Sequence, residues 1–98
     1  MRRPLVAIIG AGDAAPDSPE YMLAQACGAA VIDAGARVVC GGLGGIMEAA
    51  ARGAHESVHY VEGSTIGILP GDDPAAANAW VDVPIATGLG RARNFIVA

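Results

Sequence analysis

The segment Arg37-Val-Val-Cys-Gly-Gly-Leu-Gly-Gly-Ile46 decides the fold that we expect for this chain. Arg37–Cys40 predicts a short strand, in which Val38 to Cys40 are apolar, and the next five residues include four glycines. An Ala-rich stretch with helical character then runs from Ile46 to Ala54. A strand that passes through a glycine turn directly into a helix is a typical unit of an alternating α/β fold. The segment therefore predicts a parallel sheet covered by helices.

Apolar runs on both sides of this segment extend the alternation. Leu5–Ile9 is continuously apolar and ends at a glycine turn, so we interpret it as a fully buried strand of a parallel sheet. Thr65–Leu69 predicts a third strand, which Pro70-Gly71 closes. Val81–Thr87 is interrupted by Pro84, and it therefore predicts at most an edge strand.

A helix is expected between the first two strands. Asp17 and Glu20 have the spacing of a D-x-x-E capping box, and Gly35 is placed to end the helix. An apolar stripe at helical spacing predicts the face that packs on the sheet, and it comprises Leu23, Cys27, Ala30 and Ala34.

A third helix is expected after Gly88–Gly90, and its last residues, Phe95–Ala98, are apolar and carry no stop signal. Together the elements predict a Rossmann-like three-layer α/β fold with a mostly parallel sheet. A sheet of so few strands would leave one face poorly covered. We therefore expect residues 1–98 to be the N-terminal part of a single Rossmann-like nucleotide-binding domain that is truncated at its C-terminus.

Composition limits the classes of function. The chain has 98 residues, is 53% hydrophobic and carries a net charge of −4, which disfavours nucleic acid and anionic membranes as partners. It contains no lysine, so it cannot form the internal aldimine of a pyridoxal-phosphate enzyme. Cys27 and Cys40 lack C-x-x-C spacing and predict buried thiols in a reducing compartment, the cytoplasm. The apolar run after Arg2-Arg3 is too short for an export signal.

Two glycine turns follow strands and are candidates for phosphate binding. Gly10-Ala-Gly-Asp-Ala-Ala15 has the letters of the dinucleotide fingerprint G-x-G-x-x-G/A, but Pro16 and Pro19 delay the helix that should follow it at once. Gly41–Gly45 lies directly between a strand and a helix, where backbone N–H groups and the helix dipole favour an anion. A turn that only packs the strand against the helix is the alternative. We expect a phosphate at Gly41–Gly45.

The stretch His55-Glu-Ser-Val-His59 spells H-E-x-x-H, the signature of zinc peptidases. That motif requires a continuous helix, whereas Gly53 and Gly63 bracket this stretch and Val58–Val61 favours extended structure. No later histidine is available as a third ligand, although an aspartate could substitute. We expect polar surface histidines and no metal site.

Three motifs occur in order along the chain: Gly41-Gly-Leu-Gly-Gly-Ile-Met-Glu48, Ile68-Leu-Pro-Gly-Asp-Asp-Pro74 and Thr87-Gly-Leu-Gly-Arg-Ala-Arg-Asn94. With them the chain resembles, over nearly its whole length, the Lonely Guy superfamily, which is often labelled lysine decarboxylase-like. It is most similar to the branch that includes the molybdenum cofactor carrier proteins. The resemblance implies a Rossmann-like fold, a homo-oligomer, and glycine-rich turns that bind a phosphate.

Enzymes of this superfamily are phosphoribohydrolases that cleave the N-glycosidic bond of nucleoside 5′-monophosphates, including cytokinin ribotides. The resemblance gives Arg93 the place of their catalytic arginine, whereas Asn94 stands where they have a lysine. Their catalytic glutamate lies in a P-G-G-x-G-T-x-x-E motif that these residues lack. Because cleavage of a ribosyl bond calls for a carboxylate, we do not expect hydrolysis by this chain alone. The expected ligand-binding residues are Gly10, Gly12, Gly41, Gly42, Gly44, Gly45, Met47, Arg93 and Asn94.

Three hypotheses of function remain after the sequence. The first is a carrier that binds a small phosphorylated ligand, either a nucleoside monophosphate or the molybdenum cofactor. The second is a phosphoribohydrolase whose full-length form supplies the missing glutamate. The third is a remnant without activity.

Overall fold

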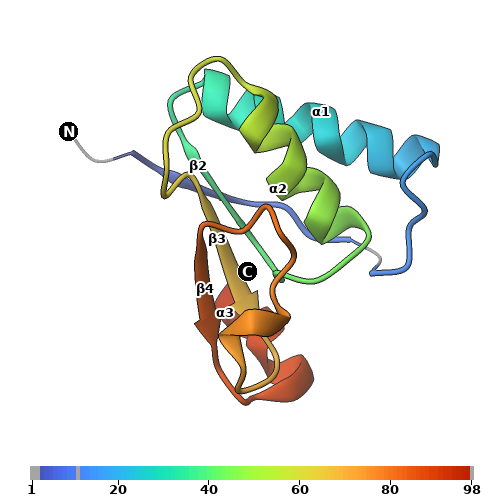
Figure 1. The fold of residues 1–98 in the computed structure, drawn as a ribbon, viewed down its shortest axis with the longest axis vertical. Coiled ribbons are helices and arrows are strands. Elements are labelled where there is room, and N and C mark those ends of the chain that lie inside the picture. Colours follow the sequence, from blue (N-terminus) through green and yellow to red (C-terminus); the bar gives the residue numbers. More distant parts are fainter. Residues whose placement is uncertain (1–2, 11, 98) are drawn as a thin grey trace.

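The computed structural model describes residues 3–10 and 12–97, and in the last segment it describes the side chains of residues 93, 96 and 97. Figure 1 shows two long helices lying side by side over one face of a sheet. The elements are β1 (Leu5–Ala7), α1 (Pro19–Asp33), β2 (Arg37–Cys40), α2 (Ile46–Glu56), β3 (Thr65–Leu69), the 3-10 turn η1 (Pro74–Ala76), β4 (Val83–Ala86), the 3-10 turn η2 (Gly90–Arg93) and α3 (Asn94–Val97).

The sheet has the order β1-β2-β3-β4, and all of its strand pairs are parallel. The prediction of a Rossmann-like sheet is thereby confirmed, and the bounds of β2 and β3 agree with the sequence. β4 lies at an edge, where Pro84 is opposite Gly67. An edge position suits Pro84 because one side of an edge strand needs no N–H donor.

Helices cover the two faces of the sheet unequally. α1 and α2 share one face, and the core between them and the sheet includes Tyr21, Ala49 and Ile32 of the helices and Val38 of β2. On the other face, Ile96 and Val97 of α3 line a cavity together with apolar side chains of all four strands, such as Ile68. The result is the three-layer arrangement that was expected, with a short helix as its third layer. No helix of the described residues is both long and apolar enough to cross a bilayer.

The start and the buried face of α1 differ from the prediction. The N-cap is Ser18, whose hydroxyl accepts a hydrogen bond from the Tyr21 N–H, so the proposed Asp17 capping box is wrong. The residues that α1 buries are Tyr21, Ala24, Gly28 and Ile32, whereas Leu23 of the predicted stripe is 67% exposed. The helix is apolar on nearly every side, so spacing alone does not identify the buried face. The end of the helix is as predicted, because Gly35 follows it with a φ of +84°.

The first strand is not fully buried. β1 has only three residues, and Leu5 is 57% exposed, because the strand lies at the edge of the sheet. The predicted burial of the two thiols is correct for Cys40 and wrong for Cys27. Cys27 lies on the side of α1 that borders β1, where it lines an open apolar groove together with Val6 and Ala30.

Candidate functional site

The N-terminus of α2 carries the candidate site. β2 leads through Gly41–Gly45 into Ile46, and the first hydrogen bond of the helix runs from the Ala49 N–H to the Gly45 oxygen. The N–H groups of the first turn of a helix have no partner within the helix, and the helix dipole gives that end a partial positive charge. Because the N-cap residue is Gly45, no cap side chain competes for those N–H groups. The arrangement suits an anion.

The second glycine turn lies against the same helix end. A Cβ added to Gly10 would be 2.7 Å from Cγ2 of Ile46, and one added to Gly12 would be 3.4 Å from Cε of Met47. Gly44 faces this turn closely, since a Cβ added to it would be in ordinary contact with the Gly12 oxygen at 3.5 Å. The two turns that the sequence analysis identified separately are therefore neighbours.

The α1 helix does not begin at the Gly10–Gly12 turn. It starts at Pro19, after a separate turn, so its N–H groups do not follow the glycines directly. A dinucleotide fingerprint requires that direct succession. The geometry agrees with the interpretation that this turn is not a dinucleotide site of the usual kind.

Arg93 reaches the Gly41–Gly45 turn from the far end of the chain. Its guanidinium Nη2 lies 3.7 Å from Sδ of Met47, with the geometry of a hydrogen bond. A Cβ on Gly41 would be 3.0 Å from Cζ and Nη1 of Arg93 and would also overlap Sδ of Met47. Arg93 is half-buried. The structure thus places a cation and a soft thioether directly beside the glycine turn.

Gly42 has a packing role within the turn. Its φ is +82°, and a Cβ there would be 2.6 Å from Cδ2 of Leu69. Both facts require glycine at this position. The side chain of Asn94 lies outside the described residues, as does that of Arg91. Of the other expected ligand-binding residues, Gly10, Gly12, Gly41, Gly44, Gly45, Met47 and Arg93 gather around the start of α2.

Asn78 contacts the turn and was not identified from the sequence. Its Nδ2 donates to the Leu43 oxygen at 2.8 Å and to the Gly42 oxygen at 3.3 Å, and its backbone N–H donates to the Gly42 oxygen at 2.8 Å. Asn78 lies in the loop between η1 and β4. A side chain that binds backbone carbonyls of a distant segment leaves no motif, so the sequence carried no signal for it.

Cys40 lies beneath the turn as a neutral thiol. It is fully buried, and burial raises its pKa, although a hydrogen bond with the Gly42 backbone and the charge of Arg93 act in the opposite direction. A thiol with a raised pKa is a poor nucleophile and a poor metal ligand at neutral pH. Cys40 is therefore a buried thiol directly before the turn, where it packs and does not react.

The H-E-x-x-H residues do not form the helical arrangement of a zinc peptidase. α2 ends at Glu56, so His59 lies beyond the helix. Nε2 of His55 is 2.7 Å from the Trp80 oxygen and 3.3 Å from Oδ1 of Asp82, and its ring stacks on Tyr60. Burial, followed by the hydrogen bond with Asp82, raises the pKa of Tyr60 to about 12. His55 therefore helps to anchor the loop before β4.

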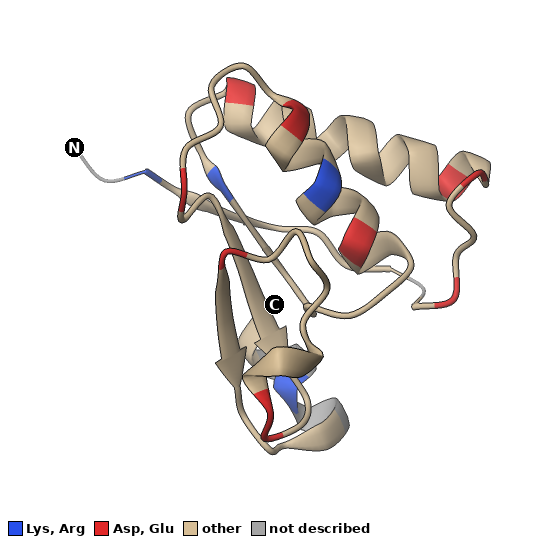
Figure 2. Cartoon of the chain, viewed as in Figure 1, with Lys and Arg blue, Asp and Glu red and all other residues tan. Residues whose placement is uncertain are grey.

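Charged residues are sparse around the candidate site at the start of α2. Figure 2 shows acidic positions on the helices and in the loops and a few separate basic positions, so the described residues form no continuous basic stripe. Arg93 is thus a local cation in an acidic chain with a net charge of −4. A small anion held by a few donors suits such a site better than an extended polyanion does.

The parallel sheet and its helices define a Rossmann-like protein, and the glycine turns and Arg93 at the start of α2 form a candidate site. The chain belongs to the SLOG cluster4 family, whose model matches residues 3–98. A relative from Archaeoglobus fulgidus, an uncharacterized protein, is 36% identical over 97 residues, which are 99% of this chain and 60% of that protein.

Two solved structures are similar in fold and sequence. The molybdenum cofactor binding protein of the phototrophic bacterium Rippkaea orientalis is 36% identical with a TM-score of 0.84, and the match covers 99% of this chain and 57% of that one. The Moco (molybdenum cofactor) carrier protein of Chlamydomonas reinhardtii is 35% identical with a TM-score of 0.75, covering 93% of this chain and 53% of that one. The chain thus spans little more than half the length of these proteins.

Proposed function

We propose that this chain is the phosphate-binding, N-terminal part of a single nucleotide-binding domain, and that it works in a carrier for a nucleotide-like cofactor. The observation that carries the proposal is the meeting of two glycine turns and the Arg93 guanidinium at the N-terminus of α2. The similarity to a molybdenum cofactor binding protein and to a Moco carrier protein supports the molybdenum cofactor as the ligand.

The residues present fit the phosphate group of such a ligand. Gly44 leaves space that a Cβ would fill, the first turn of α2 supplies N–H donors, and Arg93 supplies a cation from the side of Gly41. A guanidinium can bind two oxygens of one phosphate at once. The glycine turns and the start of α2 offer backbone N–H donors and one charged side chain, Arg93, which suit a phosphate. We therefore assign the pterin or base of the ligand to other parts of the protein.

Arg93 acts in this proposal as a binding residue. Cleavage of an N-glycosidic bond would need a carboxylate at the sugar, and the P-G-G-x-G-T-x-x-E motif that carries it in the superfamily enzymes is absent from these 98 residues. A carrier needs only to hold its ligand and shield it. The free thiols of Cys27 and Cys40 are in keeping with the cytoplasm as the compartment that we propose.

The proposal is tested by identifying what the folded chain binds. We expect the chain, purified from cells that make the cofactor, to contain molybdenum and a pterin in about equal amounts, measured by elemental analysis and by fluorescence of the oxidised pterin. We also expect AMP and inorganic phosphate to shift the amide resonances of Gly44 and Met47 in an NMR titration. A folded chain that binds none of these ligands would refute the proposal.

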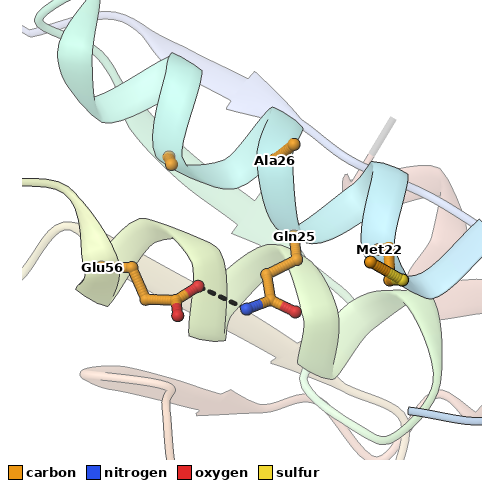
Figure 3. A pocket seen from close by; sticks show the side chains of 5 residues that line it. Met22, Gln25, Ala26 and Glu56 are labelled. Carbon is orange, nitrogen blue, oxygen red and sulfur yellow. Dashed lines mark hydrogen bonds between the residues drawn. The ribbon is translucent and has the colours of Figure 1, made fainter. Parts of the chain in front are cut away.

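We also propose self-association through the exposed apolar side of α1. Met22 and Leu23 are 61% and 67% exposed, and Cys27 and Ala30 continue this surface toward β1. Figure 3 shows Met22 and Ala26 lining a second hollow, beside the hydrogen bond from Gln25 to Glu56 of α2. Apolar surface of this extent on a helix favours burial against another chain.

Cys27 offers a direct test of that association. We expect a thiol reagent to modify Cys27 quickly in dilute protein and slowly at high concentration, while sedimentation shows a shift from monomer to oligomer. Cys40 serves as the internal control, because it is fully buried and should stay unmodified at every concentration. A monomer at high concentration with a fully reactive Cys27 would contradict the proposal.

A further inference from the structure

Asn78 donates three hydrogen bonds to the Gly41–Gly45 turn. Two of its donors converge on the Gly42 oxygen, at 2.8 Å from the backbone N–H and 3.3 Å from Nδ2, and Nδ2 also donates to the Leu43 oxygen at 2.8 Å. These two carbonyls belong to consecutive peptide units in the middle of the turn. The loop before β4 thereby fixes the orientation of both units.

Because the peptide unit is planar, this contact also fixes the direction of the N–H groups on the opposite side of the turn. In a trans peptide unit the C=O of one residue and the N–H of the next point in opposite directions. When Asn78 holds the carbonyls of Gly42 and Leu43, the N–H groups of Leu43 and Gly44 must therefore point away from Asn78. Successive N–H groups directed to one side form a concave anion-binding surface.

We propose that Asn78 is the positioning residue of the phosphate site: it orients the Gly42 and Leu43 carbonyls so that the N–H groups of Leu43 and Gly44 face the ligand. This role rests on the proposed function of the turn as a phosphate site. Asn78 acts through the backbone, on the side opposite to the ligand. Glycine has more backbone conformational freedom than other residues, so the glycine-rich turn depends on an external constraint of this kind.

The loop that carries Asn78 is held independently of this contact. Oγ1 of Thr65 donates to the Trp80 oxygen at 2.6 Å and accepts from the Asp82 N–H at 2.9 Å. The Asp82 carboxylate accepts from the N–H groups of Gly63 and Thr65. Oδ1 of Asn78 also accepts from the Trp80 N–H at 3.0 Å, as in an Asx turn. The loop does not need the Nδ2 donor for its own conformation.

Asn78→Ser separates the two roles of this side chain. A serine hydroxyl can still accept from the Trp80 N–H, as in the related turn formed by serine, but it lacks the amide group that spans two carbonyls. Thr65→Val is the matched control, since it removes hydrogen bonds of the same loop without touching the glycine turn. Asn78→Asp is a second variant, in which the side chain keeps its shape and loses both amide donors.

We expect Asn78→Ser to weaken the binding of inorganic phosphate and AMP about fivefold to tenfold, and Asn78→Asp to weaken it further. Thr65→Val should bind both ligands within about twofold of wild type, even if its melting temperature falls by as much as that of the Asn78 variants. In ligand-free protein, the Leu43 and Gly44 amide resonances should shift in both Asn78 variants and stay in place in Thr65→Val. Thermal unfolding of each variant shows that it is folded.

Two outcomes would overturn the role of Asn78. One is that either Asn78 variant, when folded, binds phosphate and AMP as well as Thr65→Val does. The other is that the Leu43 and Gly44 amide resonances are the same in a folded Asn78 variant as in wild type. If wild-type protein binds neither ligand, the proposed function fails, and the amide resonances alone still decide whether Asn78 orients the turn.

Discussion

Gly44→Asp is expected to lower the affinity for a phosphate ligand about 100-fold while the chain stays folded. A carboxylate at this position would meet the ligand as a like charge, which costs several kcal/mol in a confined site. About 2.7 kcal/mol corresponds to a factor of 100 in affinity. The fold should tolerate the change, because a Cβ on Gly44 would meet only the Gly12 oxygen, at an ordinary contact distance of 3.5 Å. Calorimetric titration with AMP measures the loss.

Gly44→Ala is the control for the added Cβ. We expect it to bind AMP within about threefold of wild type, since it fills some space but brings no charge. Gly42 could not be used in this way, because its φ of +82° and its contact with Leu69 make any side chain disruptive. If the aspartate variant is folded and binds AMP as tightly as the alanine variant, the phosphate does not lie at Gly44.

The strands at the centre of the fold were predictable because their signals are local. Arg37–Cys40 and Thr65–Leu69 are short, largely apolar segments that end at Gly41 and Pro70, and their bounds in the structure agree with the sequence. The burial of β1 was not predictable, because it depends on which strands and helices lie beside Leu5 and Val6. Exposure there reflects an edge position, and an apolar run carries no information about its neighbours.

The face of α1 was mispredicted for a related reason. Leu23 and Cys27 fit a helical stripe as well as Tyr21 and Ala24 do, because nearly every position of the helix is apolar or small. Only the contacts with α2 select Tyr21, whose hydroxyl donates to Glu48. Where every side of a helix can be buried, tertiary packing decides and periodicity does not.

The site was predictable in its parts but not in its assembly. The glycine turns and Arg93 were identified from spacing and resemblance, and the structure brings Gly12 close to Gly44 and Arg93 close to Gly41. The two glycine turns lie close together because they follow neighbouring strands of a parallel sheet, and such turns lie at the same edge of the sheet. Asn78 could not be found in this way, since its partners are carbonyl groups that any sequence would provide.

Arg93→Ala is expected to reduce the affinity for AMP about tenfold or more. The guanidinium lies beside Gly41 and Met47, where it can give a phosphate a charge-assisted, bidentate partner worth about 1.5–3 kcal/mol. Each 1.4 kcal/mol corresponds to about a factor of ten in affinity. A role limited to a surface ion pair would be worth about 0–1 kcal/mol of stability and would leave ligand affinity unchanged. Titration of the folded variant distinguishes the two.

Arg91→Ala is the matched control, because it removes the same charge two residues away. Both residues lie in the 3-10 turn η2, where positions two apart are separated by about 120° around the axis, so we expect only one of the two to face the ligand. We therefore expect Arg91→Ala to change AMP affinity less than twofold, and Arg93→Lys to restore part of the loss, because it keeps the charge without the planar fork. Equal losses from Arg91→Ala and Arg93→Ala would mean that the arginines act only through net charge. An unchanged affinity in folded Arg93→Ala would remove Arg93 from the phosphate site altogether.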